Sequence, residues 1–438
     1  MDAWKFEYEL DKENYTKLFD ECMKEDQEQN IEFLEKTIKD IIPRKYAVAC
    51  QNGTDALMFS LKCLGIGPGD EVLTTNFSWI STASCISMVG AKPVFCDINI
   101  LNYHMSLDSI KKMYSSKVKA IVYPHLFGNM SDTKEIIEWC FSKNVHFIED
   151  AAQAIGSSFN GKPAGTIGDF STISFNANKT IGGIAGGGVV LTDRKDWADT
   201  CIKLRKHGNH DLLGYNSKML FFNAKFIDYR LKKLNEYIEK KQAIAKMYDE
   251  QLKDYVTVQP TSNGVNHTYH KYVIRLQNKE VRDKVKDKLG AKVHYNKPIS
   301  ENPMYRNLHP YEFSGNIHFE NIKHRKDDLF ITQTVCDTIL TLPIHPYMKG
   351  EEVDEVINTI LILHDQEEEK FVENMKKVLG DDMFDKSLIN EITEPIYDFI
   401  VEKTYQLPEY IEEVEFKNKR KLKIAFNKFY ENLTRDTK

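Results

Sequence analysis

The chain has 438 residues, of which 42% are hydrophobic and 11% aromatic, and this apolar content supplies a buried interior and excludes global disorder. A formal net charge of −6 at pH 7 gives no electrostatic footprint for nucleic acid, and no stretch has the apolar length of a membrane span. Because the first residues lack the pattern of a signal peptide and the eight cysteines form no CxxC pair, we expect a soluble cytoplasmic protein with reduced thiols, no structural zinc and no nucleic-acid or membrane partner.

Short apolar strands alternate with helical stretches through the first half of the chain. The predicted strands are residues 46–50, 71–75, 91–97, 118–124, 145–150 and 170–175. This alternation is typical of an α/β fold with a mostly parallel, doubly wound sheet. We assign residues 1–235 to this large domain.

The rest of the chain changes in character. A long helix from about Asn223 to Lys253 is predicted to link the large domain to a smaller α+β domain, residues 236–364. The predicted strands of this smaller domain include residues 272–276 and 293–295. Residues 365–438 combine acidic and basic runs with apolar residues at helical intervals, and we expect them to form a helical C-terminal extension.

A tight turn joins the first predicted strand to a helix. It contains Gly53 and Thr54, which would present free amides, a hydroxyl and the positive end of the helix dipole. These groups suit a phosphate. The alternative is an ordinary capped junction with Thr54 near the cap position.

Two further positions suit contact with a flat ring. Trp79 follows a predicted strand, where its indole would stack on a heteroaromatic ring or belong to the core. The strand at residues 145–150 ends in Asp150, with Gln153 three positions later, and α/β folds place ligand-facing groups at this edge. Asp150 would hold a protonated ring nitrogen, or it would cap a helix.

Lys179 is the candidate nucleophile. It lies between the strand at residues 170–175 and a run of glycines at residues 182–188, which let the backbone approach a ligand closely. A lysine amine condenses with an aldehyde when its surroundings let it lose its proton. The alternative is a glycine-rich hairpin with a surface lysine. The scattered histidines, by contrast, match no metal-ligand set.

Together these stretches resemble the ordered signature of the DegT/DnrJ/EryC1/StrS aminotransferases, which are pyridoxal-phosphate enzymes of fold type I. The resemblance covers roughly residues 30–360, and its specificity lies in the order and spacing of the pieces. The motifs that carry it are residues 52–56, Trp79, residues 149–153, Ser174 with Lys179, and residues 214–218.

The resemblance implies a role for each matching residue. Lys179 would bind the aldehyde of pyridoxal 5′-phosphate and shuttle a proton, while Asp150 would pair with the pyridinium nitrogen. Trp79 would stack on the ring and Gln153 would contact the ring 3-hydroxyl. The residues implied for the phosphate are Gly53, Thr54, Ser174 and, from the neighbouring subunit of a homodimer, Asn216.

The implied reaction is transfer of an amino group, with glutamate as donor, to a nucleotide-linked keto-sugar. Two departures bear on it: Gly186 stands where many members have an acid, and Lys218 where they have an arginine, whose bidentate fork a lysine cannot reproduce. The nearest rival is a pyridoxal-phosphate-dependent sugar dehydratase of the same fold, which carries histidine in place of Lys179. A non-catalytic protein that binds the cofactor or a sugar nucleotide is the other alternative.

Overall fold

The computed structural model describes residues 3–259, 261–306 and 329–379. The chain divides into two compact units, residues 1–359 and residues 360–438. The division predicted at residues 235 and 236 falls inside the first unit and stays a prediction. Residues 380–438, most of the predicted extension, lie outside the described residues.

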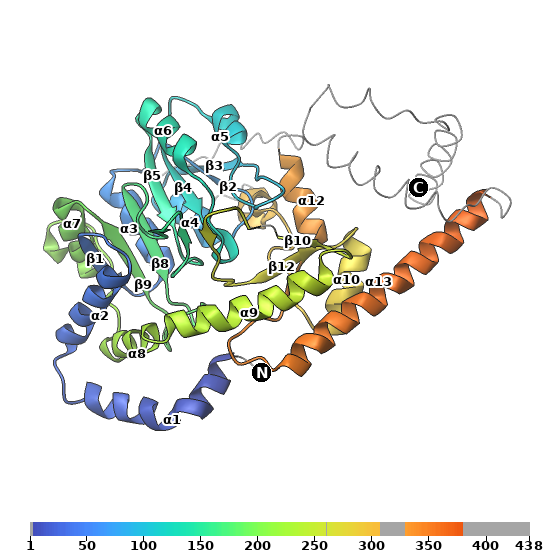
Figure 1. Cartoon of the computed structure of the whole chain (residues 1–438). Helices are drawn as coiled ribbons and strands as arrows, with labels where there is room; N and C mark the ends of the chain where they lie inside the picture. Colours follow the sequence, from blue (N-terminus) through green and yellow to red (C-terminus); the bar gives the residue numbers. More distant parts are fainter. Residues whose placement is uncertain (1–2, 260, 307–328, 380–438) are drawn as a thin grey trace. The chain divides into compact units, whose positions relative to one another are not determined.

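A seven-stranded sheet forms the centre of the first unit (Figure 1). In spatial order its strands are β1 (Tyr46–Cys50), β9 (Gly188–Thr192), β8 (Phe170–Ser174), β5 (His146–Asp150), β4 (Val118–Pro124), β2 (Glu71–Thr75) and β3 (Lys92–Cys96). Strands β3, β2, β4, β5 and β8 pair in parallel, whereas β9 is antiparallel to both of its neighbours. The predicted fold class, a mostly parallel α/β sheet, is confirmed.

Helices cover both faces of this sheet. Those that precede or follow its strands are α1 (Ala3–Cys22), α2 (Gln27–Ile41), α3 (Gly53–Cys63), α4 (Ser81–Met88), α5 (Leu107–Met113), η1 (Leu126–Gly128), α6 (Lys134–Lys143), α7 (Lys195–Arg205), η2 (His207–His210), α8 (Phe221–Leu231) and α9 (Leu234–Leu252). In β1, Ala47 and Ala49 pack toward α2 and α8, while Val48 and Cys50 pack toward α3 and α7. This alternation is the period of two that buries both faces of a strand.

Smaller elements complete the described chain. They are the strands β6 (Ser158–Phe159), β7 (Lys162–Pro163), β10 (Thr257–Val258), β11 (Val265–Asn266), β12 (Tyr272–Arg275) and β13 (Ile339–Leu342), and the helices α10 (Lys279–Leu289), η3 (Ile299–Glu301), α11 (Pro303–Arg306), α12 (Phe330–Thr338) and α13 (Gly350–Leu379). Strands β10, β12 and β13 form an antiparallel sheet, and β11, β6 and β7 form another. No helix in the described ranges is both long and apolar enough to cross a membrane.

Two predicted elements differ from the structure. The single helix expected from about Asn223 to Lys253 is two helices, α8 and α9, because Lys233 leaves helical geometry (φ −97°, ψ 3°) and its N–H bonds to the carbonyl of Arg230 in a turn. The strand expected at residues 293–295 is a turn. Only Lys292 pairs with Thr341 there, as an isolated bridge.

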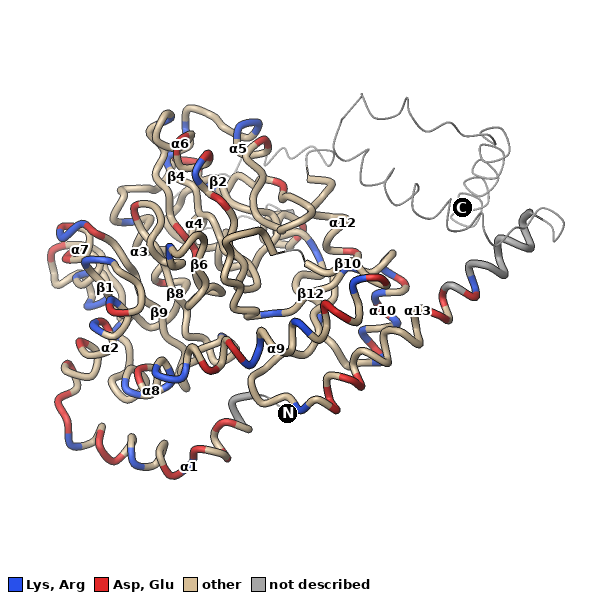
Figure 2. Tube along the Cα trace, viewed as in Figure 1, with Lys and Arg blue, Asp and Glu red and all other residues tan. Residues whose placement is uncertain are grey.

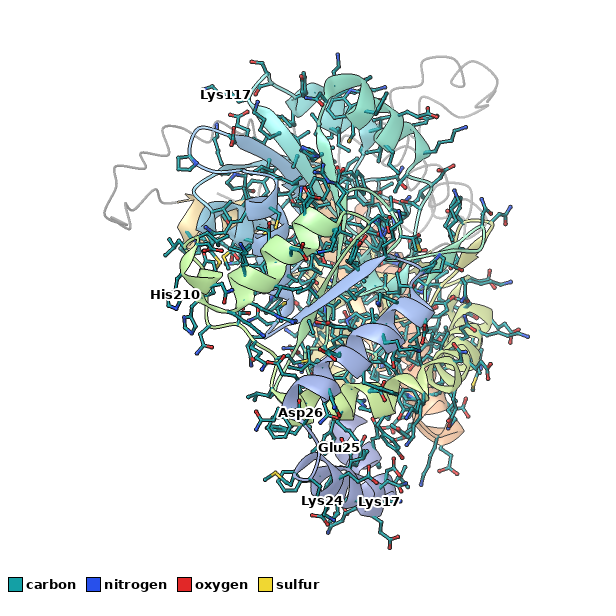
Figure 3. All side chains as sticks on the ribbon, turned by 90° about the vertical axis from the view of Figure 1, so that its left-hand side faces the viewer. Lys17, Lys24, Glu25, Asp26, Lys117 and His210 are labelled. Atoms are coloured by element: carbon teal, nitrogen blue, oxygen red, sulfur yellow. The ribbon has the colours of Figure 1, made fainter. Side chains whose placement is uncertain are left out.

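Helix α1 packs against α8 and is held there by ion pairs. Arg230 lies 2.6 Å from the carboxylate of Glu7, which also accepts hydrogen bonds from the hydroxyls of Tyr15 and Tyr237. Lys225 pairs with Glu25, in the turn between α1 and α2 that Figure 3 labels. Figure 2 shows residues of both charges interspersed along α1, and their ion pairs position this helix together with the stacking of Tyr15 on Phe226.

Arg44 connects the start of β1 to the loop before β8. Its buried guanidinium donates to the carbonyl oxygens of Gly165, Ile167 and Gly168 at 3.0, 2.8 and 2.9 Å. It also donates to the hydroxyl of Ser171 and pairs with Asp193. A planar fork of donors suits several fixed acceptors at once.

Replacing Arg44 with Met removes these donors and leaves buried carbonyl oxygens unpaired. We expect the free energy of unfolding to fall by about 3 kcal/mol, measured from the urea midpoint. Lys45→Met is the control, because Lys45 is exposed and only its backbone N–H bonds to Asp193. Equal midpoints for the two variants would contradict this account.

Candidate active site

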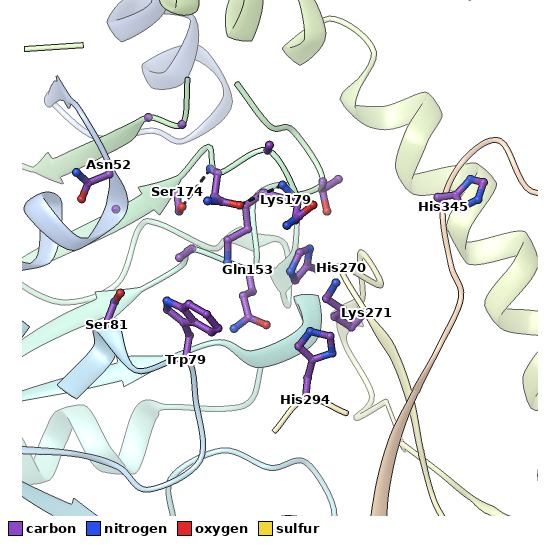
Figure 4. A pocket seen from close by; sticks show the side chains of 18 of the residues that line it. Asn52, Trp79, Ser81, Gln153, Ser174, Lys179, His270, Lys271, His294 and His345 are labelled. Carbon is purple, nitrogen blue, oxygen red and sulfur yellow. Dashed lines mark hydrogen bonds between the residues drawn. The ribbon is translucent and has the colours of Figure 1, made fainter. Parts of the chain in front are cut away.

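A cavity of about 560 Å³ opens at the carboxyl edge of the sheet (Figure 4). Strand β1 runs in the same direction as β8, because β9 is antiparallel to both, so the residues that follow β1, β2, β5 and β8 meet at this edge. The predicted residues that line the cavity are Gly53, Thr54, Trp79, Asp150, Gln153, Ser174 and Lys179. Asn216 is not among the lining residues.

One end of the cavity is the start of α3. The side chain of Asn52 caps this helix by accepting the N–H of Asp55 at 2.9 Å, so the cap is Asn52 and not Thr54. A Cβ on Gly53 would lie 2.9 Å from the Cβ of Ser174, so only glycine allows α3 and the end of β8 to approach this closely. The Thr54 hydroxyl donates to Ser81 Oγ at 2.9 Å. Hydroxyls gathered at a helix N-terminus suit a phosphate.

Asp150 ends β5 and is buried in the cavity wall. Its carboxylate accepts the Thr82 hydroxyl at 2.9 Å and the N–H of Ala152 at 3.2 Å, and no helix begins there, so it is not a helix cap. Burial raises the pKa of Asp150 above its ordinary value, although the charge of Lys179 and the Thr82 hydrogen bond oppose the rise. A cationic N–H brought into the cavity would therefore be favoured as its partner.

Lys179 lies in the turn between β8 and β9, and it lines the cavity. This connection does join two antiparallel strands, as the hairpin alternative holds, but Lys179 is not a surface lysine. Burial, with a contribution from the charge of Lys271, lowers the pKa of Lys179 to about 8, while Asp150 acts in the opposite direction. An amine with this pKa is partly unprotonated near neutral pH, as a nucleophile or proton carrier must be.

Trp79 and Gln153 also line the cavity, and both are labelled in Figure 4. Trp79 lines the cavity and 59% of it is exposed, so its indole is open to a ligand and is not part of the core. Gln153 accepts the N–H of Phe127 and donates to the hydroxyl of Tyr295, both at 3.0 Å. These two bonds fix the orientation of its amide, and its contact with a ring hydroxyl stays a prediction.

Asn216 lies in the loop before α8, where its backbone pairs with Lys206. Lys218, which replaces the expected arginine, forms an ion pair with Glu28 at 2.6 Å. The expected contact of Asn216 with a neighbouring subunit stays a prediction.

The sequence analysis missed several residues of the opposite wall. Those that contribute a charged or polar group are Glu7, Arg230, Tyr237, Lys241, His270, Lys271, Lys292, His294, Tyr295, His345 and Tyr347. Lys241 carried a usable signal, because it occurs at helical spacing among the buried residues Tyr237, Ile244 and Tyr248 of α9. Within the described ranges, no group of three or more His, Cys, Asp or Glu side chains is arranged to hold a metal ion.

Comparison with known proteins identifies the family. Residues 10–361 match the model of the DegT/DnrJ/EryC1/StrS aminotransferase family. The chain belongs to this family. The aminotransferase is 30% identical to the pleiotropic regulatory protein of Geobacillus stearothermophilus, over 81% of this chain and 95% of that protein. It is 31% identical to UDP-N-acetyl-3-dehydro-alpha-D-glucosamine 3-aminotransferase of Acidithiobacillus ferrooxidans, over 72% and 83% of the two chains.

Solved structures agree with this assignment. A DegT/DnrJ/EryC1/StrS aminotransferase from Brucella abortus superimposes with a TM-score of 0.74 at 26% identity, over 83% of this chain and 98% of that one. NtdA from Bacillus subtilis, solved with its bound cofactor PMP, gives 0.66 at 27% identity over 77% of each chain. The fold is therefore that of the fold type I sugar aminotransferases.

The cofactor of this family is pyridoxal 5′-phosphate, and the cavity fits it. The close approach of Gly53 to Ser174 at a helix N-terminus suits the phosphate, and the buried carboxyl of Asp150 suits a ring nitrogen that carries a proton. The amine of Lys179 suits the aldehyde. These three groups, far apart in sequence, line one cavity.

Replacing Asp150 with Asn removes the negative charge that favours the ammonium form of Lys179. We expect the pKa of Lys179 to fall below about 8 in the cofactor-free protein. The pH dependence of Lys179 modification by trinitrobenzenesulfonate, followed by peptide mass spectrometry, measures it. Asp169→Asn is the control, because Asp169 pairs with His146 and does not line the cavity. A Lys179 profile that is the same in both variants would refute the coupling.

Proposed function

We propose that this aminotransferase moves an amino group from glutamate to the keto carbon of a sugar linked to a nucleotide diphosphate. The observation that carries the proposal is that Lys179 and Asp150 line one cavity with the start of α3. The names of relatives support the substrate class. They include GDP-perosamine synthase of Escherichia coli, 35% identical over 72% of its length, and UDP-2-acetamido-2-deoxy-3-oxo-D-glucuronate aminotransferase of Pseudomonas aeruginosa, 29% identical over 85%.

The residues of the cavity have different expected roles in this reaction. When bound, pyridoxal 5′-phosphate supplies an aldehyde and an electron-accepting ring. Asp150 would hold the proton on the ring nitrogen, and Thr82 keeps its carboxylate oriented. Trp79 would cover one face of the ring and exclude water. The Nζ of Lys179 would take a proton from the reacting carbon and return it, a task that its lowered pKa permits.

Two rival functions make different demands on the cavity. A dehydratase of this fold carries histidine where this chain has Lys179, and a binding protein needs no amine of lowered pKa beside a buried carboxyl. Both are therefore less well supported than amino transfer. We also infer that the enzyme works in the cytoplasm, because all eight cysteines are free, as a reducing compartment requires.

Borohydride reduction of the cofactor-loaded protein is expected to add the mass of one cofactor to the peptide that contains Lys179. Lys179→Ala should show no such mass and should lower glutamate-dependent amination of keto-sugar nucleotides by about a thousandfold or more. Lys203→Ala is the control, because Lys203 pairs with Asp211 away from the cavity. Label at another lysine, or full activity of Lys179→Ala, would refute the assignment.

We further propose a homodimer in which Asn216 completes the phosphate site of the partner subunit. Leu213, in the same loop as Asn216, is 82% exposed. Leu220 and Ile184, which are close in sequence to elements of the cavity, are also exposed. Apolar side chains at such exposure are suited to burial between subunits.

A mixed dimer tests this arrangement. Lys179→Ala and Asn216→Asp should each be inactive, the second because it brings a negative charge to the phosphate. A mixed dimer, isolated through a different tag on each chain, has one intact site and should recover about half of the wild-type activity. An inactive mixed dimer, or a monomer in sedimentation, would contradict the shared site.

A further inference from the structure

More basic than acidic side chains line the cavity. Arg230 is paired with Glu7, and Lys179 is opposed by Asp150. Lys241, Lys271 and Lys292 also line the cavity, and in the described part of the chain no ion pair joins any of them to an acid. We call Lys241, Lys271 and Lys292 the lysine cluster.

The lysine cluster runs from the depth of the cavity to its mouth. Lys241 is 3% exposed, and its amine donates to the hydroxyl of Thr180 at 3.0 Å, beside Lys179. Lys271 is half-buried and Lys292 is exposed. Burial and the charge of Lys271 lower the pKa of Lys241 to about 7, because no counter-charge stabilises its ammonium form. An anionic ligand beside it would supply that counter-charge.

Two histidines accompany the lysine cluster without adding charge. Burial, with the charges of Lys179, Lys271 and Lys241, lowers the pKa of His270 well below its ordinary value. Burial and neighbouring lysines lower the pKa of His294 to about 4. Both rings are therefore neutral near pH 7 and supply polar contacts only, so the positive charge beside these histidines comes from the lysines.

The position of the lysine cluster relates it to the reacting carbon. In Figure 4, His270, Lys271 and His294 are grouped on the side of the cavity away from Asn52 and Ser174, which mark the phosphate end. Lys179 lines the same cavity, and its charge contributes to the lowered pKa of both histidines. An amino-acid donor carries a carboxylate on the carbon that holds its amine. The diphosphate of a sugar nucleotide is separated from the keto carbon by several bonds.

We propose that the lysine cluster is the carboxylate-binding subsite for the amino donor and selects a dicarboxylic amino acid. Lys271, with Lys241 behind it, binds the carboxylate next to the amine, and Lys292 binds the second carboxylate at the mouth. Lys241 is buried and Lys292 is exposed, so the lysine cluster offers one position for negative charge inside the cavity and another at its mouth. This inference rests on the proposed amino transfer and adds the recognition of the donor.

Calorimetric titration of the cofactor-loaded protein tests the subsite without turnover. The probes are glutarate, a dicarboxylate without an amine, and butyrate, its monocarboxylate counterpart. We expect Lys292→Met to weaken glutarate binding about tenfold and to leave butyrate binding unchanged. Lys271→Met should weaken both, also by about tenfold.

Charge-preserving and distant variants control this experiment. Lys271→Arg and Lys292→Arg should keep most of the glutarate affinity, because the positive charge remains. Lys297→Met should behave as wild type, since Lys297 is exposed, close in sequence to Lys292 and does not line the cavity. In the donor half-reaction, Lys292→Met should lose its preference for glutamate over alanine.

Two results would overturn the inference. One is glutarate binding that is the same in Lys271→Met, Lys292→Met and wild type. The other is a loss of affinity for UDP in these variants with glutarate binding intact, which would assign the lysine cluster to the sugar nucleotide. Failure of the wild type to aminate any keto-sugar nucleotide would instead refute the proposed function, while the glutarate titration would still decide the role of the lysines.

Discussion

The buried carboxylate of Glu149 is the constraint on which the cavity depends. It is fully buried at the end of β5, where it accepts the N–H groups of Gly165 and Ile167 and the hydroxyl of Ser171, and it lies 3.0 Å from His125 Nε2. Burial alone would raise the pKa of Glu149, but these hydrogen bonds outweigh it and lower the pKa. The loop that Arg44 holds is therefore also tied to the strand end that presents the next residue, Asp150.

Glu149 and Asp150 show how two adjacent carboxyls acquire different properties. The carboxylate of Glu149 is surrounded by hydrogen-bond donors, so its charge is stabilised and its role is structural. The second points into the cavity with only Thr82 and a backbone N–H as partners, and burial raises its pKa. Glu149 does not line the cavity, so its charge anchors the end of β5, and Asp150 is the carboxyl that the cavity wall presents.

The sequence predicted six of the seven strands of the sheet and one wall of the cavity because those features are local, whereas it missed β9, which follows the glycine run. The strand bounds of β1, β2 and β4 follow from apolar runs of five to seven residues, and the residues after β1, β5 and β8 are placed by the rule for carboxyl edges of parallel strands. The opposite wall depends on how α1, α9, the residues before β12 and the turn after α10 fold back, and apart from the buried spacing of Lys241 no local pattern specifies that. The break between α8 and α9 was missed for the same reason, because Lys232 and Lys233 favour helices as strongly as their neighbours do.

Helix α1 contributes Glu7 to the cavity wall, yet the match to the family begins only at residue 10. A protein trimmed to the matching segment would lose the acid that pairs with Arg230 and would retain a half-buried, unpaired guanidinium in the same cavity as the lysines. The first turns of α1 thus contribute to the wall of the cavity. A tag fused to the amino end of the chain is best separated from α1 by a flexible spacer.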